Sequence, residues 1–89
     1  MAMVSSLSLK LRDMLLEKGF QLLDIYRIHE KKGEEYIAID ELRVKDKQTG
    51  KVFLVKLDGP KEAMDPEKIV ELVLNTVRKI EKEEEKEKS

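Results

Sequence analysis

The sequence contains no cysteine and no tryptophan, and it has a single histidine, His29. The absence of cysteine excludes a disulfide framework, a thiolate metal site and a thiol nucleophile, and one histidine cannot form a histidine cluster. Glycine-rich phosphate loops are missing too, because the "DGP" turn at residues 58–60 has no glycine run followed by Lys and Ser or Thr. We therefore expect no cofactor, no metal and no catalytic residues.

Long hydrophobic runs are also missing. The longest apolar stretch is far shorter than the ~20 residues that span a bilayer. The opening "MAMVSSLSLK" lacks a basic start followed by an apolar segment, so it does not resemble a signal peptide. These absences predict a cytoplasmic protein without a membrane partner.

Charge of one sign is not in excess, since 18 basic residues face 19 acidic ones and the net charge is −1. A dedicated nucleic-acid binder would show a strong basic surplus. Charged residues form 42% of the chain, but hydrophobic residues still reach 40%, which distinguishes it from a disordered polyelectrolyte. Most of the charge is Lys and Glu, a bias typical of heat-adapted proteins, so we expect a thermophilic source.

Two helices are predicted from apolar spacing. Leu7, Leu11, Met14 and Leu15 recur at helical intervals after the serines at the start, and Gly19 is suited to a C-terminal cap. A second helix should begin at Asp65 and Pro66, as N-cap and first helical residue, and carry apolar residues as far as Ile80. The sequence thus predicts one domain over residues 1–80 and a charged tail over 81–89, frayed helix or disordered.

Three strands are predicted between these helices, at about residues 20–29, 35–44 and 51–57. Polar, glycine-containing turns separate them, and a bulge near Asp40 and Glu41 would explain a shift in the apolar pattern of the second strand. The order helix, strand, strand, strand, helix has short links. It predicts an α+β fold, a three-stranded antiparallel sheet with two helices packed on one face.

The stretch "KVFLVKL" at residues 51–57 suggests a strand with apolar side chains on both sides. Two helices on one face of a sheet would leave the other face bare, and such a patch exceeds what monomers usually expose. The leading hypothesis is a small non-enzymatic protein-interaction module that forms a homodimer. Its candidate self-association residues come from all three strands and the second helix: Leu23, Ile25, Ile37, Ile39, Leu54, Leu72 and Leu74. The alternative is that the helices, the tail or strand twist gather these residues into one core.

Three polar residues interrupt apolar faces on consecutive strands: Asp24, Asp40 and Lys56. With the element order, they resemble the restriction-endonuclease-like nucleases, in which carboxylates hold a divalent cation and a lysine polarises the attack on phosphate. Leu54 stands where that family's motif has its second carboxylate, and "ELR" at residues 41–43 restores an acidic and basic pair with too few strands before it. A degenerate nuclease is therefore the third hypothesis.

The element order is also similar to double-stranded RNA-binding domains, which start their second helix with basic residues. Here that start reads "DPEKIVE", which is acidic. A basic hairpin edge remains possible, and it would carry Arg27, Lys31, Lys32, Arg43, Lys45, Lys47 and Lys51. Such lysines commonly protect strand edges from aggregation. Weak, non-specific nucleic-acid binding is the second hypothesis.

Overall fold

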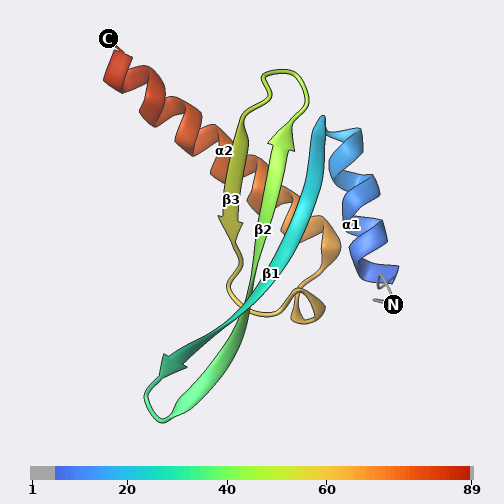
Figure 1. Ribbon diagram of the computed structural model, residues 1–89, viewed down its shortest axis with the longest axis vertical. Helices are drawn as coiled ribbons and strands as arrows, with labels where there is room; N and C mark the ends of the chain where they lie inside the picture. The colour runs from blue at the N-terminus through green and yellow to red at the C-terminus, as the bar shows by residue number, and fades with distance from the viewer. Residues whose placement is uncertain (1–5, 89) are drawn as a thin grey trace.

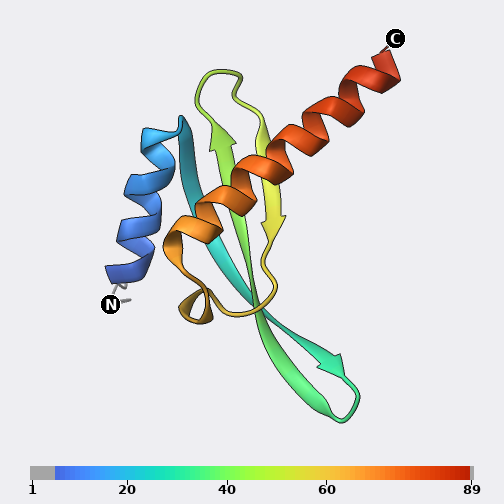
Figure 2. The ribbon, with the colours of Figure 1, turned by 180° about the vertical axis from the view of Figure 1, so that it is seen from behind.

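The computed structural model describes residues 6–88 and confirms the predicted order of elements (Figure 1). The elements are α1 (Ser6–Glu17), β1 (Phe20–Lys32), β2 (Glu35–Asp46), β3 (Val52–Lys56), a short 3-10 helix η1 (Lys61–Ala63) and α2 (Pro66–Lys88). The strands form one antiparallel sheet in the order β1-β2-β3. Both helices lie on the same face of this sheet, as Figures 1 and 2 show from opposite sides. The α+β prediction is therefore correct.

The helix ends follow the sequence signals. Gly19 adopts a φ of 87°, a left-handed conformation that suits glycine, and its N–H donates to the Leu16 carbonyl at 3.0 Å. At the start of α2 the Asp65 carboxylate accepts the N–H of Glu67 at 3.1 Å, and its carbonyl accepts the N–H of Ile69 at 3.1 Å. Asp65 is thus the N-cap that the sequence predicted.

The β1–β2 hairpin continues well beyond the rest of the sheet. β1 pairs with β2 as far as Lys32 and Glu35, whereas β3 pairs with β2 only over residues 41–45. The residues beyond β3, 28–39, form a projecting two-stranded ribbon (Figure 1), which we call the hairpin arm. Sequence reasoning ended the first strand at residue 29 because the charged residues that follow carry no apolar pattern. Residues 31–36 at the tip of the arm are exposed, so no such pattern is required there.

A β-bulge lies in β1, between Leu22 and Asp24, where the register with β2 shifts by one residue. The bulge predicted near Asp40 and Glu41 is wrong, because the register of β2 with β1 is continuous through both residues. The extra residue in β1 moves the inward-facing positions from Leu22 to Ile25, and both pack against the core.

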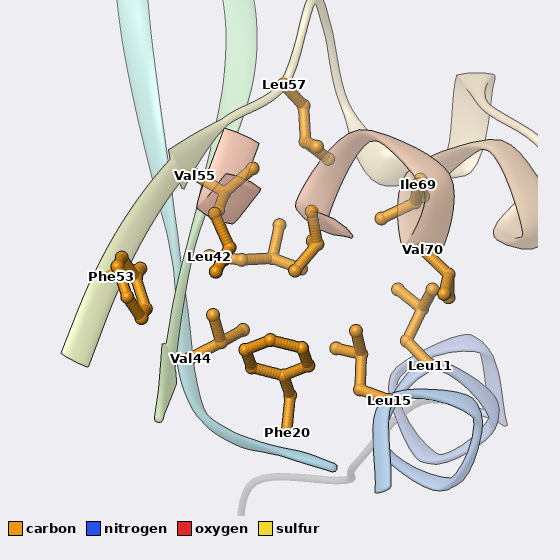
Figure 3. Close-up of a cluster of buried hydrophobic side chains, with 12 residues drawn as sticks. Leu11, Leu15, Phe20, Leu42, Val44, Phe53, Val55, Leu57, Ile69 and Val70 are labelled. Carbon is orange, nitrogen blue, oxygen red and sulfur yellow. The ribbon is translucent and has the colours of Figure 1, made fainter. Parts of the chain in front are cut away.

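The core fills the space between the inner face of the sheet and the two helices (Figure 3). Its buried side chains are Leu11, Leu15, Phe20, Leu42, Val44, Phe53, Val55, Leu57, Ile69, Val70, Val73 and Val77. The stretch "KVFLVKL" alternates: Phe53, Val55 and Leu57 are buried, whereas Val52 and Leu54 are 50% and 56% exposed. The helices therefore cover one side of this strand only.

The charged end of the chain, residues 81–88, continues α2 past the edge of the sheet (Figure 1). An ion pair connects this segment to the sheet, from Lys51 Nζ to Glu84 Oε2 at 2.6 Å. Neither α1 nor α2 is long and apolar enough, over the described residues, to cross a membrane.

Candidate interaction surface

The face of the sheet opposite the helices, which we call the outer face, has a charged centre. In β2 the inward positions are the buried Leu42 and Val44. Strand alternation therefore places Glu41, Arg43 and Lys45 on the outer face. The middle strand thus presents a row of charges where a fully apolar layer was expected.

The first ion pair on this face joins β1 to β2. Arg43 donates from Nη2 to Asp24 Oδ2 at 2.5 Å and from Nε to Asp24 Oδ1 at 3.2 Å. The Tyr26 hydroxyl donates to the same carboxylate at 3.2 Å. The hydrogen bonds and charge of Asp24 raise the pKa of Arg43 above its ordinary value. Arg43 is consequently engaged within its own sheet.

A second ion pair, between Lys56 of β3 and Glu30 of β1, passes across β2. Lys56 lies opposite Glu41 in the register, and Glu30 lies opposite Ile37. Ile39 is on the same face midway between those two β2 positions, so the ion pair must pass over it. This arrangement accounts for the burial of Ile39, which is only 3% exposed. The carboxylate of Glu30 raises the pKa of Lys56 by hydrogen bonding and charge.

The exposed large apolar side chains of the sheet lie mainly on its two edge strands. They are Leu23, Tyr26 and Ile28 on β1, which we call the β1 margin, and Val52 and Leu54 on β3, the β3 margin. Five of the six such residues in the three strands belong to these margins, and the sixth is Tyr36 in the hairpin arm. The outer face is therefore apolar along its edges and charged in between.

The seven self-association candidates have different environments. Leu23 and Leu54 are exposed on the margins, at 37% and 56%. The others are Ile39, which is buried, Ile37, which is half-buried in the hairpin arm, and Ile25, Leu72 and Leu74, which pack against the core. Sequence reasoning did not select Tyr26, Ile28 or Val52. The signal for Val52 was available, because strict alternation in β3 puts residues 52 and 54 on one side.

Asp24, Asp40 and Lys56 do not form a cluster. Asp24 and Lys56 belong to the two separate ion pairs of the outer face. Asp40 is fully buried, at 0% exposure, on the helix side of β2. The arrangement that a nuclease-like site would need is therefore not assembled by these three residues.

Asp40 instead organises a cluster with Arg27 of β1. Arg27 donates from Nε to Asp40 Oδ1 at 2.9 Å and from Nη2 to Asp40 Oδ2 at 3.0 Å. These hydrogen bonds hold the pKa of Asp40 below its ordinary value, although burial opposes the shift. Asp40, and then Glu62, raise the pKa of Arg27. Both members of the pair are therefore stabilised in their charged forms.

The same cluster holds the segment that leads from β3 into α2. The backbone N–H of Lys61 donates to Asp40 Oδ2 at 2.8 Å, and Arg27 Nη2 donates to Glu62 Oε2 at 2.6 Å. The Asp40 backbone also accepts from Leu57 at 2.9 Å and donates to Gly59 at 3.2 Å. Asp40 thus fixes residues 57–61 against the hairpin, which is a structural role that its burial and its five hydrogen bonds explain.

The seven basic candidates do not form one surface. Arg27 and Arg43 are held by the ion pairs described above, and Lys51 is held by Glu84. Lys31 and Lys32 lie at the tip of the hairpin arm, whereas Lys45 and Lys47 lie near the β2–β3 turn at the opposite end of the sheet (Figure 1). A nucleic acid would therefore meet two small basic groups at opposite ends of the sheet.

Within residues 6–88, no group of three or more His, Asp or Glu side chains lies together in a way that could hold a metal ion. Every buried side-chain nitrogen or oxygen in that part of the chain has a hydrogen-bond partner. The two apolar margins are thus the surface that most needs an explanation. Comparisons with protein-family models, with curated proteins and with solved structures find no match for this chain.

Proposed function

We propose that the chain is a small non-enzymatic protein-interaction module that self-associates as a homodimer through an apolar margin of its sheet. The observation that supports this is the concentration of exposed apolar side chains on the two edge strands. Soluble proteins usually protect edge strands with charged residues, because an unpaired edge readily pairs with another chain. Apolar groups retained at such edges favour association.

The charged centre of the outer face supports association through a margin over face-to-face stacking of two sheets. Stacking would remove Glu41, Arg43 and Lys45 from water, and desolvating charges is unfavourable unless each finds a close partner. Burial of a margin leaves that row hydrated. Tyr26 and Ile28, at 48% and 39% exposure, still have apolar area to bury.

The test compares carboxylates placed at equally exposed positions. Ile28 on the β1 margin is 39% exposed and Leu16 on α1 is 40% exposed, so Leu16→Asp is a matched control for Ile28→Asp. Leu54→Asp tests the β3 margin in the same way. Sedimentation velocity and circular dichroism are measured for each variant and for the wild type.

We expect at least one margin variant to be a folded monomer while Leu16→Asp remains a dimer. The physical reason is that a buried carboxylate without a partner opposes association. Dimers of unchanged affinity in both margin variants, or a wild type that is already monomeric, would contradict the proposal.

A further inference from the structure

The outer edge of β1 carries unpaired backbone groups. In β2, Asp40 and Asp46 direct their backbone N–H groups toward the β3 side, to Gly59 and Lys51. Because the direction alternates along a strand, Glu41, Arg43 and Lys45 direct theirs toward β1. Because this direction alternates regularly, it can be assigned for every residue of the hairpin beyond the bulge.

The β1 residues opposite those β2 positions direct their backbone N–H and C=O groups toward β2. Tyr26 lies opposite Glu41, and Ile28 lies opposite Ile39. Arg27 and His29 consequently direct their N–H and C=O groups away from the sheet. By the same alternation, Ile25 and Lys31 do so as well.

No other element among residues 6–88 pairs with this edge. β1 is the end strand of the sheet, and among residues 6–88 no backbone hydrogen bond outside regular elements involves residues 25, 27, 29 or 31. The side chains of residues 26–29 are all exposed. β3, by contrast, offers an edge of only five residues. The β1 edge is the longer site for pairing with another strand.

We infer that two copies of the chain join by antiparallel pairing of their β1 edges, about a two-fold axis at Ile28, into a continuous six-stranded sheet. This inference rests on the proposed function and specifies the geometry of that self-association. A two-fold axis makes the interface isologous, so each copy contributes the same strand. The hydrogen-bonding groups described above would then be paired across the axis.

The length of the regular part of β1 favours this register. The bulge ends regular geometry at Asp24, and the strand ends at Lys32. The midpoint of residues 24–32 is Ile28. Centring the axis there pairs the full regular segment with its copy, and any other register shortens the ladder.

Side-chain chemistry favours the same register. Ile28 meets Ile28 of the second copy, Tyr26 meets Glu30 of that copy, and Asp24 meets its Lys32. The first is an apolar pair and the last an opposite-charge pair, both of which stabilise when directly opposite, and the Tyr26–Glu30 pair brings no like charges together. Arg27 and His29 become a hydrogen-bonded pair, as their outward backbones require.

Neighbouring registers bring like charges together. An axis at Arg27 would place Arg27 opposite itself and Asp24 opposite Glu30. An axis at His29 would place Arg27 opposite Lys31, and an axis at Glu30 would place that carboxylate opposite itself. Like charges directly opposite destabilise a strand pair. Only the Ile28 register combines full length with complementary pairs.

The absence of cysteine from the sequence allows a direct test of this register. Residues at the Ile28 position would form a non-hydrogen-bonded pair with Cα atoms about 4.5 Å apart. That separation lies within the range of about 4.4 to 6.8 Å that a disulfide bridges. Ile28→Cys should therefore form a covalent dimer on mild oxidation. Leu54→Cys and Tyr36→Cys, both more exposed than Ile28, serve as controls and should remain monomeric on a non-reducing gel.

A second variant tests the backbone pairing itself. Because the N–H of His29 points away from β2, His29→Pro removes no hydrogen bond within the chain and should stay folded. It removes two hydrogen bonds from the dimer, one in each copy, and should weaken association by roughly tenfold or more. His29→Ala keeps the N–H and should associate like the wild type.

The outcomes separate this arrangement from the proposed function. Rapid cross-linking of Ile28→Cys alone, with weakened association of His29→Pro, supports the β1 pairing. A wild-type dimer in which Leu54→Cys cross-links faster than Ile28→Cys overturns the pairing and leaves the proposed function standing. A wild type that sediments as a monomer overturns both.

Discussion

Arg27 and Asp40 are cross-strand neighbours in the β1–β2 hairpin, joined by two parallel hydrogen bonds of 2.9 and 3.0 Å. The carboxylate is fully buried, while the guanidinium side chain remains 41% exposed. This pair lies where the hairpin arm leaves the sheet and where the chain turns from β3 toward α2. It therefore connects the part of the molecule that carries the β1 edge to the part that holds the core.

Replacing Asp40 should destabilise the fold. In Asp40→Ala the Lys61 N–H and the Arg27 guanidinium lose their acceptor, and we expect the free energy of unfolding to fall by about 2 kcal/mol, the scale of a hydrogen bond to a charged group. The remaining Arg27 is half exposed, so water moderates the loss. Asp58→Ala removes an exposed carboxylate from the same loop and should change stability by less than about 0.5 kcal/mol. Urea unfolding measures both, and equal effects would contradict a structural role for Asp40.

The stabilisation by Asp40 should disappear in acid. Its pKa in the folded chain lies below the ordinary value of 3.8, because Arg27 hydrogen-bonds the charged form. The unfolded chain therefore takes up this proton at a higher pH than the folded chain does. The contribution is fully present above pH 3.8 and is lost as the pH falls through the folded pKa.

The measurement is the difference in unfolding free energy between the wild type and Asp40→Asn, followed from neutral pH downward. We expect a constant difference at neutral and mildly acidic pH that shrinks below about pH 4. A difference that grows as the pH falls would show that the carboxylate is not stabilised in its charged form.

Substitution by Asp at two adjacent residues of β3 should have very different effects on stability. Phe53 is 5% exposed within the core, so Phe53→Asp should cost about 3 to 5 kcal/mol or prevent folding. Leu54 is 56% exposed on the outer face, and Leu54→Asp should retain the wild-type circular dichroism spectrum and lose less than about 1 kcal/mol. Unfolding of Leu54→Asp would mean that the outer face of β3 is covered within the monomer.

Nucleic-acid binding should be weak. Of the seven basic candidates, those outside the ion pairs, Lys31, Lys32, Lys45 and Lys47, are split between two ends of the sheet, so few phosphates can be neutralised there at once. We expect a dissociation constant above about 100 μM for duplex DNA or RNA near physiological salt, measured by fluorescence anisotropy. Tight binding that persists on raising salt from about 50 to 200 mM would favour the nucleic-acid hypothesis.

Sequence reasoning predicted the order of elements because the signals are local. Gly19, Asp65 and Pro66 act on their immediate neighbours, and the structure has each at the expected helix end. The bulge was misplaced because Asp40 was expected at a shift in pattern. It is instead an inward residue whose partner, Arg27, is thirteen positions earlier. A polar residue can be predicted on a buried face only when the partner that neutralises it is known.

The interaction surface was only partly predictable for the same reason. Ile39 has the pattern of an exposed apolar residue, but an ion pair between Lys56 and Glu30, twenty-six positions apart, passes over it. The charged row on β2 follows from alternation about the buried Leu42 and Val44, a signal that the sequence contained but that was not used. Leu54 was selected because the apolar stretch around it predicted a strand with apolar side chains on both sides, and the structure places it on the outer face with 56% exposure.

We propose that the chain self-associates through the edge of its sheet. Sedimentation equilibrium of the wild-type chain at micromolar concentration tests it most directly, because the technique reports mass independently of shape. We expect a mass approaching twice the 10.4 kDa of one chain, decreasing on dilution. A mass of one chain that stays constant across the concentration range would contradict it.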